Sequence, residues 1–261
     1  SDLDRLIKKK NVTEVLLATP SLSRKQRNEI INFLGPYPVL VRSLPSVSEL
    51  AQGKVKVNDL FEIDLRDLLG REPVKPNIEL LKVNISKKVV LVTGAGGSIG
   101  SELCRQILHQ KPEKLILFDI SEFSLYLIEQ ELMGFSTPGV EVFPVIGSVT
   151  DKKRMRDIFK YYGVQTVYHA AAYKHVTLVE LNASQGVINN VLGTLVAAQA
   201  AVSSNVETFV LISTDKAVKP TSVMGVSKRV AELVLQALDR QHHGTCFTMV
   251  RFGNVLDSSG S

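Results

Sequence analysis

Two adjacent ionisable residues, Asp215 and Lys216, have the types and the spacing to move protons. They follow Thr214, at the end of the apolar run Phe209–Ser213. A lysine works as a base only when burial or cationic neighbours lower its pKa, and an aspartic acid donates a proton only when its pKa is raised. Side by side in a closed pocket the two groups would share a proton, so the roles belong to the pair. Taken alone, Asp215 and Lys216 are better explained as an exposed ion pair in a loop, which is the alternative interpretation.

A glycine-rich turn between an apolar run and an amphipathic segment points to a phosphate-containing ligand. Gly94, Gly97 and Gly100 let the backbone bend sharply and let a pyrophosphate approach, and the helix expected from Ile99 offers its N-terminal N–H groups to that anion. Asp119 ends the next apolar run, 19 residues after Gly100. A dinucleotide-binding fold places there the carboxylate that holds the adenosine ribose. A turn in another doubly wound protein is the alternative.

Alternating strands and helices are expected to position these residues. Apolar, β-branched runs predict strands near 89–93, 114–118, 141–145, 165–169, 208–213 and 246–251. Amphipathic stretches predict helices near 99–110, 122–133, 151–161, 185–203 and 224–240. This order is typical of an α/β fold with a doubly wound parallel sheet of the Rossmann type, which binds ligands at the carboxyl ends of its strands. The glycine turn, Asp119 and Asp215 all fall at such ends, so we expect one site.

The N-terminal third is interpreted as a separate unit. Residues 1–69 resemble part of a small α/β unit, with strands at Glu14–Ala18 and Val39–Val41 and a helix between them. Residues 70–88, which contain Pro73, Pro76 and Asn77, are expected to be a linker, and 89–261 to be the Rossmann domain. One βαβ unit cannot close a core, so residues upstream are expected to be missing.

The positive charge of the chain is concentrated near its N-terminus. Of a formal net charge of +5, residues 1–90 contribute 16 Lys and Arg against 11 Asp and Glu, and residues 91–261 contribute 15 of each. A solvated surface is the simpler interpretation, and a surface lying against an anionic membrane face is the alternative. Nucleic-acid binding is disfavoured, because no basic stripe with interleaved aromatic residues occurs.

Several other classes are disfavoured by the sequence. No stretch approaches 18 uninterrupted apolar residues and the acidic, polar start is unlike a signal peptide, so neither a transmembrane helix nor a leader is expected within this sequence. Cys104 and Cys246 are expected to be reduced core thiols. No cluster of His, Cys, Asp and Glu has the spacing of metal ligands, so no metal is expected.

Further motifs resemble the extended short-chain dehydrogenase/reductase superfamily. The glycine turn matches T-G-x-x-G-x-x-G from Thr93 to Gly100, and Thr214 matches the Ser or Thr that closes the fifth strand. Lys228 matches the lysine of the Y-x-x-x-K pair, which in that superfamily binds the nicotinamide ribose. Met224 stands at the tyrosine position, and a thioether cannot transfer a proton. Alone, this substitution would indicate an inactive enzyme.

The surrounding stretches closely resemble the CapD-like family of bacterial nucleotide-sugar 4,6-dehydratases, whose large members carry Met at the tyrosine position. The resemblance covers roughly residues 1–261. The matching stretches are Leu68–Val74, Ala170–Val176, Leu178–Glu180, Asn189–Thr194, Ser213–Val218, Pro220–Thr221, Met224–Gly225, Ser227–Arg229 and Arg251–Leu256.

The resemblance implies a complete reaction cycle. UDP-N-acetylglucosamine would be oxidised at C4 by hydride transfer to bound NAD, lose the C5 proton and water from C6, and regain the hydride at C6 as a UDP-4-keto-6-deoxy sugar. Lys216 is expected to act as the base near C5 and Asp215 as the acid near the C6 hydroxyl. Either Thr214, through the cofactor ribose and Lys228, or a bound water would take the C4 hydroxyl proton. Met224 would fill space against substrate or nicotinamide.

The resemblance and the glycine turn together assign the binding residues. Asp119 favours NAD over NADP, because a carboxylate repels a 2′-phosphate. The residues expected at the cofactor are Gly94, Gly97, Ser98, Ile99, Gly100, Asp119, Ser121, Ser148, Val149, Ala170, Ala171, Ala172, Asn190 and Lys228. The residues expected at the substrate are Lys174, His175, Glu180 and Asn254. Purely structural roles stay open for Asn190, as a satisfied helix amide, and for His175.

The resemblance also implies a larger protein, with transmembrane helices upstream and a uridine-binding domain downstream. The chain is therefore expected to be a cytoplasmic piece of an inner-membrane-associated homo-oligomer, which holds NAD but binds its UDP-sugar poorly by itself. One alternative is a UDP-hexose 4-epimerase or reductase, which needs the tyrosine and has no use for a C5 base. Another is a non-catalytic NAD-binding regulatory or scaffold protein, which would leave Thr214, Asp215 and Lys216 without a purpose.

Overall fold

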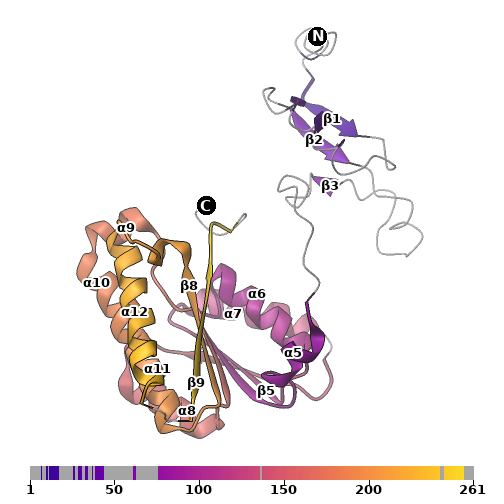
Figure 1. Ribbon diagram of the computed structural model, residues 1–261. Coiled ribbons are helices and arrows are strands. Elements are labelled where there is room, and N and C mark those ends of the chain that lie inside the picture. Colours follow the sequence, from indigo (N-terminus) through magenta and orange to yellow (C-terminus); the bar gives the residue numbers. More distant parts are fainter. Residues whose placement is uncertain are drawn as a thin grey trace. The chain divides into compact units, whose positions relative to one another are not determined.

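A computed structural model gives the structure of the chain. It describes residues 7, 10, 12–17, 26, 29, 30, 33, 34, 37, 39–43, 61, 62, 76–135, 137–241 and 244–255. The chain divides into two compact units, Ser1–Lys75 and Pro76–Ser261 (Figure 1).

The N-terminal unit contains a small mixed sheet in the order β1-β2-β3. Strand β1 (Glu14–Leu17) pairs in parallel with β2 (Leu40–Ser43), which pairs antiparallel with β3 (Phe61–Glu62). Ile7 and Leu34 are buried, and half-buried apolar residues of β1 pack against them. The described part of this unit therefore has an apolar cluster of its own.

The second unit is built on a six-stranded parallel sheet, as the sequence predicts. Its strands are β4 (Val89–Thr93), β5 (Lys114–Asp119), β6 (Glu141–Ile146), β7 (Thr166–His169), β8 (Thr208–Thr214) and β9 (Cys246–Phe252). They lie in the order β6-β5-β4-β7-β8-β9, and every neighbouring pair is parallel. The order reverses between β4 and β7, and such a switch point is where open α/β sheets bind their ligands. The prediction of a doubly wound, Rossmann-type α/β fold is confirmed.

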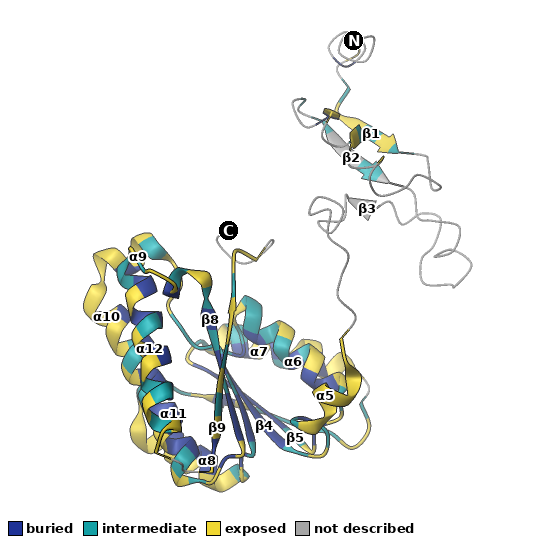
Figure 2. Ribbon diagram, viewed as in Figure 1, coloured by how far each residue is buried: buried dark blue, intermediate teal, exposed yellow. Residues whose placement is uncertain are grey.

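Helices cover both faces of this sheet (Figures 1 and 2). On one face α6 and α7 bury their apolar residues against the sheet, and on the other face α8, α11 and α12 do so. The helical elements are α5 (Ile78–Val83), α6 (Ser98–His109), α7 (Glu122–Gly134), α8 (Lys152–Tyr162), α9 (Val176–Leu181), α10 (Ala183–Val187), the π-helical turn η1 (Ile188–Leu192), α11 (Gly193–Ser203), the 3₁₀ turn η2 (Asp215–Ala217) and α12 (Val223–Asp239). Helix α5 lies within the stretch expected to be a linker.

The helical run Ala183–Ser203 is long and apolar enough to cross a membrane by length and composition. Half of its most apolar window is buried inside the fold. Val196, Ala197 and Ala201 belong to the apolar core between the sheet and its helices. This burial identifies the run as a core helix of the second unit.

The two cysteines differ in their surroundings. Cys104 on α6 is fully buried, and burial raises the pKa of its thiol. Cys246 is exposed at the start of β9. The prediction of two core thiols is therefore wrong for Cys246, because β9 is the last strand of the described sheet and alternates between exposed and half-buried residues.

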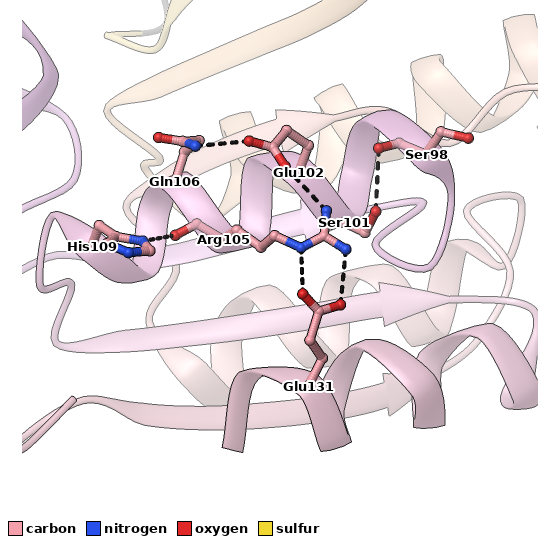
Figure 3. Close-up of polar contacts among 7 residues, drawn as sticks. All are labelled: Ser98, Ser101, Glu102, Arg105, Gln106, His109 and Glu131. Carbon is pink, nitrogen blue, oxygen red and sulfur yellow. Dashed lines mark hydrogen bonds and ion pairs between the residues drawn. The ribbon is translucent and has the colours of Figure 1, made fainter. Parts of the chain in front are cut away.

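Polar contacts fix α6, the helix that follows the glycine turn, against α7. Arg105 donates from Nε and Nη2 to the two carboxylate oxygens of Glu131, at 2.6 and 2.8 Å, and from Nη1 to Glu102 at 3.1 Å (Figure 3). These hydrogen bonds raise the pKa of Arg105 and lower the pKa of Glu131. Because the pair is partly exposed, it orients the helices more than it stabilises the fold.

Candidate functional site

The glycine turn between β4 and α6 leaves no room for side chains at three positions, Gly94, Gly96 and Gly100. Gly94 has a φ of +67°, and a Cβ added there would lie 2.7 Å from the backbone nitrogen of Ala171. A Cβ on Gly100 would lie 1.9 Å from the carbonyl oxygen of Gly94. Gly97 caps α6 without a side-chain hydrogen bond, and a Cβ there would meet only Gly94 O, at 3.4 Å. The turn therefore presents backbone to its groove, which suits a pyrophosphate.

Asp119 lies at the end of β5 and supports this turn. Its Oδ2 accepts a hydrogen bond from Gly96 N at 2.8 Å, and its Oδ1 accepts one from Ser121 N at 2.9 Å. A cavity of about 240 Å³ opens beside it and is lined by Ser148 and Val149 among others. The position and chemistry of this cavity fit the adenosine half of a dinucleotide, with the carboxylate at the ribose.

A larger cavity of about 780 Å³ lies on the other side of the switch point. Gly94, Gly97, Ala170, Ala172 and Tyr173 line both cavities, so the two form neighbouring parts of one groove. Of the residues predicted from the sequence, the larger cavity also contains Ser98, Ile99, Gly100, Lys174, His175, Thr214, Lys216, Met224, Lys228 and Asn254. Residues more than 150 positions apart in sequence thus meet at one edge of the sheet.

Lys228 and Met224 lie one turn apart on α12 and are almost fully buried. Lys228 Nζ donates to the carbonyl oxygen of Ile212 at 2.7 Å. Burial lowers the pKa of this lysine to about 8, although the nearby charge of Glu232 acts in the opposite direction. A Cβ on Gly225 would lie 2.5 Å from Lys216 O, so this glycine lets α12 approach η2 closely.

The Thr214–Lys216 turn forms a polar cluster at the cavity mouth. Asp215 Oδ1 accepts hydrogen bonds from Thr214 Oγ1 at 3.0 Å and from Lys216 Nζ at 3.3 Å. Lys216 Nζ also donates to Asn254 Oδ1 at 2.9 Å. The bonds from Thr214 and Lys216 lower the pKa of Asp215, whereas the acid role requires a raised pKa. Asp215 itself is not among the residues that line the cavity.

Three predicted binding residues have structural hydrogen bonds instead of lining a cavity. Asn190, 1% exposed, binds both the N–H and the carbonyl of Tyr173 and donates to Ser227 Oγ. Glu180 Oε1 accepts from Val223 N at 2.7 Å, at the first turn of α12. Ser121 caps α7 through its hydroxyl. Each of them positions a segment next to the groove.

Ala171 and His175 are the remaining residues that the sequence predicts at the site. Ala171 lines the smaller cavity, and its backbone approaches Gly94. His175 is the N-terminal cap residue of α9 and makes no side-chain capping bond there. Among the described residues no group of three or more His, Cys, Asp and Glu could hold a metal ion.

Two buried polar residues beside the groove escaped the sequence analysis. His169, at the end of β7, is fully buried between Thr93 Oγ1 at 2.7 Å and Thr194 Oγ1 at 3.1 Å. Glu232 on α12 is also fully buried. The sequence offers one signal for each of them: a polar residue stands at a position where the pattern of the element calls for an apolar one.

The chain matches known proteins over most of its length. The family described as "Polysaccharide biosynthesis protein" matches residues 90–261. The capsular polysaccharide biosynthesis protein CapD of Staphylococcus aureus is 43% identical over 260 residues, which are 100% of this chain and 43% of CapD. An uncharacterized membrane protein of Methanocaldococcus jannaschii, MJ1061, is 43% identical over 176 residues, 67% of this chain and 51% of that protein. The chain thus spans about half the length of the curated relatives it matches.

Relatives with named activities are more distant. The UDP-N-acetylglucosamine 4,6-dehydratase (inverting) of Campylobacter jejuni is 31% identical over 179 residues, 67% of this chain and 52% of that enzyme. UDP-glucose 4-epimerases of several Rickettsia species are 31–33% identical over 67% of this chain and 51% of each enzyme. Identity alone therefore does not separate a dehydratase from an epimerase.

Solved structures share the fold of the second unit. Pen from Bacillus thuringiensis has a TM-score of 0.63 and 30% identity, covering 68% of this chain and 55% of that one. DesIV, a dTDP-glucose 4,6-dehydratase from Streptomyces venezuelae solved with NAD, has a TM-score of 0.53 and 26% identity, covering 62% of this chain and 54% of that one.

Proposed function

The chain belongs to the polysaccharide biosynthesis protein family, within the superfamily of NAD-dependent epimerases and dehydratases, and from this we propose that it carries the NAD-binding and proton-transferring part of a UDP-N-acetylhexosamine 4,6-dehydratase. The observation that supports the proposal most is the Thr214–Lys216 turn. It contributes to the same cavity as Lys228, while Met224 occupies the place where an epimerase needs an acid–base residue.

NAD suits the groove chemically. The glycine turn lines both cavities with backbone, and Asp119 presents a carboxylate beside the smaller cavity. When bound, NAD would supply the hydride acceptor and donor for the sugar. We propose that Gly94, Gly97 and the first turn of α6 hold its pyrophosphate, that Asp119 holds the adenosine ribose, and that Lys228 binds the nicotinamide ribose.

The proposed reaction removes water in balanced steps. Loss of a hydride from C4 and of a proton from the C4 hydroxyl gives a ketone, which makes the C5–H acidic. Lys216 takes the C5 proton, and the electron pair forms a C5–C6 double bond as the C6–O bond breaks. Asp215 gives a proton to the departing hydroxyl, which leaves as water. The hydride then returns to C6 and a proton to C5.

The free chain holds Asp215 and Lys216 as an ion pair with a salt-bridge distance of 3.3 Å, which is not the protonation state that these roles need. A sugar that covers the pair would remove water from both charges. Desolvation disfavours the charged forms, so a proton would pass from Lys216 to Asp215 and leave an amine and a carboxylic acid. We propose that substrate binding itself prepares the acid and the base in this way.

Isotope exchange tests this proposal. The assay uses a protein of the relatives' full length that contains this chain. We expect UDP-N-acetylglucosamine in deuterated water to gain deuterium at C5 and a C6 methyl signal by NMR. Asp215→Asn and Lys216→Met should each lower turnover by roughly 10²-fold or more. The matched control is the exposed pair Glu79 and Lys82 on α5, 3.0 Å apart, where Glu79→Gln and Lys82→Met should leave turnover unchanged.

The same experiment distinguishes the competing functions. An epimerase would return a C4-inverted sugar without a methyl group, and this product would replace the dehydratase proposal. A non-catalytic NAD-binding protein would bind the cofactor and leave the sugar unchanged. The name of MJ1061, an uncharacterized membrane protein, supports the further proposal that a protein of the relatives' full length is associated with a membrane.

A further inference from the structure

Glu232 is a fully buried carboxylate that the proposed chemistry does not use. Its Oε1 accepts hydrogen bonds from Ser213 Oγ at 2.6 Å and from Arg251 Nε at 2.7 Å. Its Oε2 accepts from Arg251 Nη2 at 2.5 Å and from Arg229 Nη1 at 3.0 Å. A buried charge with four donors is fully compensated, and losing a partner would be costly.

Three of these four donors come from the two strands that end at the larger cavity, and the fourth, Arg229, lies on α12. Ser213 on β8 and Arg251 on β9 are register partners in the parallel ladder. Ser213 directly precedes Thr214, and Arg251 lies two residues before Gly253. A Cβ on Gly253 would lie 3.3 Å from Asp215 Oδ2, so the two strand ends approach each other there. One carboxylate therefore ties both strand ends to α12.

Glu232 also lies one helical turn after Lys228 on α12. Lys228 binds the carbonyl of Ile212, and Glu232 binds the side chain of the next residue, Ser213. The helix thus holds two successive residues of β8, just before the Thr214–Lys216 turn. The spacing between Lys228 and that turn depends on both contacts.

We propose that Glu232 is a positioning residue, which aligns the carboxyl ends of β8 and β9 with Lys228 and places its own negative charge one helical turn from Lys228. This inference rests on the proposed function only in taking Lys228 and the Thr214–Lys216 turn as the groups that must be aligned.

The electrostatics of the site agree with the geometry. Burial alone would raise the pKa of Glu232, but the hydrogen bonds from Arg251, Ser213 and Arg229 outweigh it and hold this pKa at about 2. Glu232 is thus ionised at neutral pH. The negative charge of Glu232 on α12 raises the pKa of Lys228. His169 on β7 is held neutral by burial and by the charge of Lys228. Arg229 on α12 and Arg251 on β9 bind Glu232 and keep it ionised.

The direct test measures the pKa of Lys228 in the complete chain by NMR with lysine labelled with ¹³C at Cε, the signal being assigned with Lys228→Arg. Glu232→Gln keeps the size of the side chain and removes its charge. We expect the Lys228 pKa to fall by about one pH unit, because a nearby opposite charge shifts a pKa by this order. A site that merely loosens would admit water, and the pKa would instead rise towards 10.5. A rise or no change would overturn the electrostatic half of the proposal.

A second variant separates charge from geometry. Glu232→Asp keeps the charge but shortens the reach to Ser213 and Arg251. We expect a Lys228 pKa near that of the wild type together with at least tenfold lower turnover in the dehydration assay. Wild-type turnover in this variant would overturn the positioning role. If the wild type dehydrates no sugar but the Lys228 pKa responds as expected, the proposed function fails and the electrostatic half of this inference stands.

Two controls complete the design. Glu131 on α7 is also held by a two-pronged arginine contact, from Arg105, and lies outside both cavities, so Glu131→Gln should leave the Lys228 pKa unchanged (Figure 3). If Glu232→Gln does not fold, Glu232→Gln with Arg251→Gln replaces the ion pair by two amides. Because Glu232 is the charge that acts on Lys228, the pKa should still fall, and a rise would overturn the proposal.

Discussion

Met224 lies at the start of α12, nearly buried, with its side chain at the wall of the larger cavity. Its thioether has no proton to give, so any contribution to turnover comes from its shape. Lys228, one turn later, keeps the donor that a nicotinamide ribose would need. In the proposed reaction the proton transfers therefore fall to the turn that follows β8 and not to position 224 of α12.

We predict that Met224→Leu retains turnover within about tenfold of the wild type, because leucine and methionine have similar volumes and such exchanges are well tolerated. Steady-state dehydration assays check this. Lys228→Met provides the contrast, since it removes the Nζ donor, and should lower turnover by roughly 10²-fold. A hundredfold loss in Met224→Leu would show that the sulfur has a chemical role.

Asp119 should decide which nicotinamide cofactor binds. We predict that Asp119→Ala weakens NAD binding by about tenfold or more and narrows the preference over NADP, because the carboxylate both accepts from Gly96 N and repels a 2′-phosphate. Calorimetric titration with each cofactor measures this. Asp151→Asn is the control, since Asp151 only caps α8. Unchanged selectivity between NAD and NADP in Asp119→Ala would show that Asp119 does not contact the cofactor.

At the residue scale the sequence located most of the groove but not the hydrogen bonds that some of its side chains make. Glycine spacing and the position of Asp119 after an apolar run are local signals, and the structure places both at the groove. Asn190, Glu180 and Ser121, which the sequence predicted at ligands, make hydrogen bonds to the protein, and the sequence had left such a structural role open for Asn190. Such partners come from distant elements, so no local pattern reveals them. The pKa of Asp215 likewise depends on side-chain rotamers that a sequence does not contain.

Elements meet closely where α12 crosses η2. Gly225 has room only for a hydrogen atom, because a Cβ added there would lie 2.5 Å from Lys216 O and 3.2 Å from Pro220 Cβ. The obstacle at the nearer contact is backbone, which cannot rotate away. The separation of α12 from the Thr214–Lys216 turn is therefore set by a single missing methyl group.

We predict that Gly225→Ala lowers the free energy of unfolding by about 1–3 kcal/mol, the usual cost of overpacking, and lowers turnover by displacing η2. Urea unfolding and the dehydration assay measure the two effects. Gly134→Ala on α7 is the matched control, since nothing lies within 4 Å of its added Cβ. It should be neutral or stabilising, because alanine favours helix. Equal stability of both variants would contradict the close approach.

The long elements were predictable and the short ones were not. The sequence placed the six strands of the second unit within one or two residues, because each contains consecutive apolar or β-branched residues between polar segments. Helices α5 and α9 contain six residues each, too few for a helical period to emerge. The predicted helix 185–203 is in fact divided by the π-helical turn η1. Composition does not distinguish a π-helical turn from an α-helical one.

The whole second unit should unfold more readily in mild acid because of one buried imidazole. Burial, together with the charge of Lys228, lowers the pKa of His169 to about 3. An unfolded histidine titrates near 6.5, so below that pH the unfolded chain binds a proton that the folded chain refuses. The free energy of unfolding therefore falls as the pH drops from about 6.5 to about 3, by up to about 1.4 kcal/mol per pH unit.

We predict that His169→Gln makes the free energy of unfolding less dependent on pH between about 4 and 6.5, since an amide cannot titrate there. Urea unfolding across this range, for the variant and the wild type, measures the slope. His109→Gln is the control and should keep the wild-type slope, because His109 is an exposed residue on α6 whose Nδ1 bonds the carbonyl of Arg105 (Figure 3). A wild-type slope in His169→Gln would mean that His169 does not titrate as the burial indicates.

The π-helical turn Ile188–Leu192 has a genetic consequence. A π-helical turn contains one residue more than an α-helical turn, so deleting a single codon within it could restore an uninterrupted α-helix. The segments on either side would keep their relative orientation about the helix axis, because the π-helical turn and the α-helical turn that replaces it each cover one full rotation. Loss of the Asn190 codon itself would remove the side chain that holds both backbone groups of Tyr173 and the carbonyl that accepts from Thr194. An in-frame loss of three nucleotides could therefore abolish activity while leaving the chain folded.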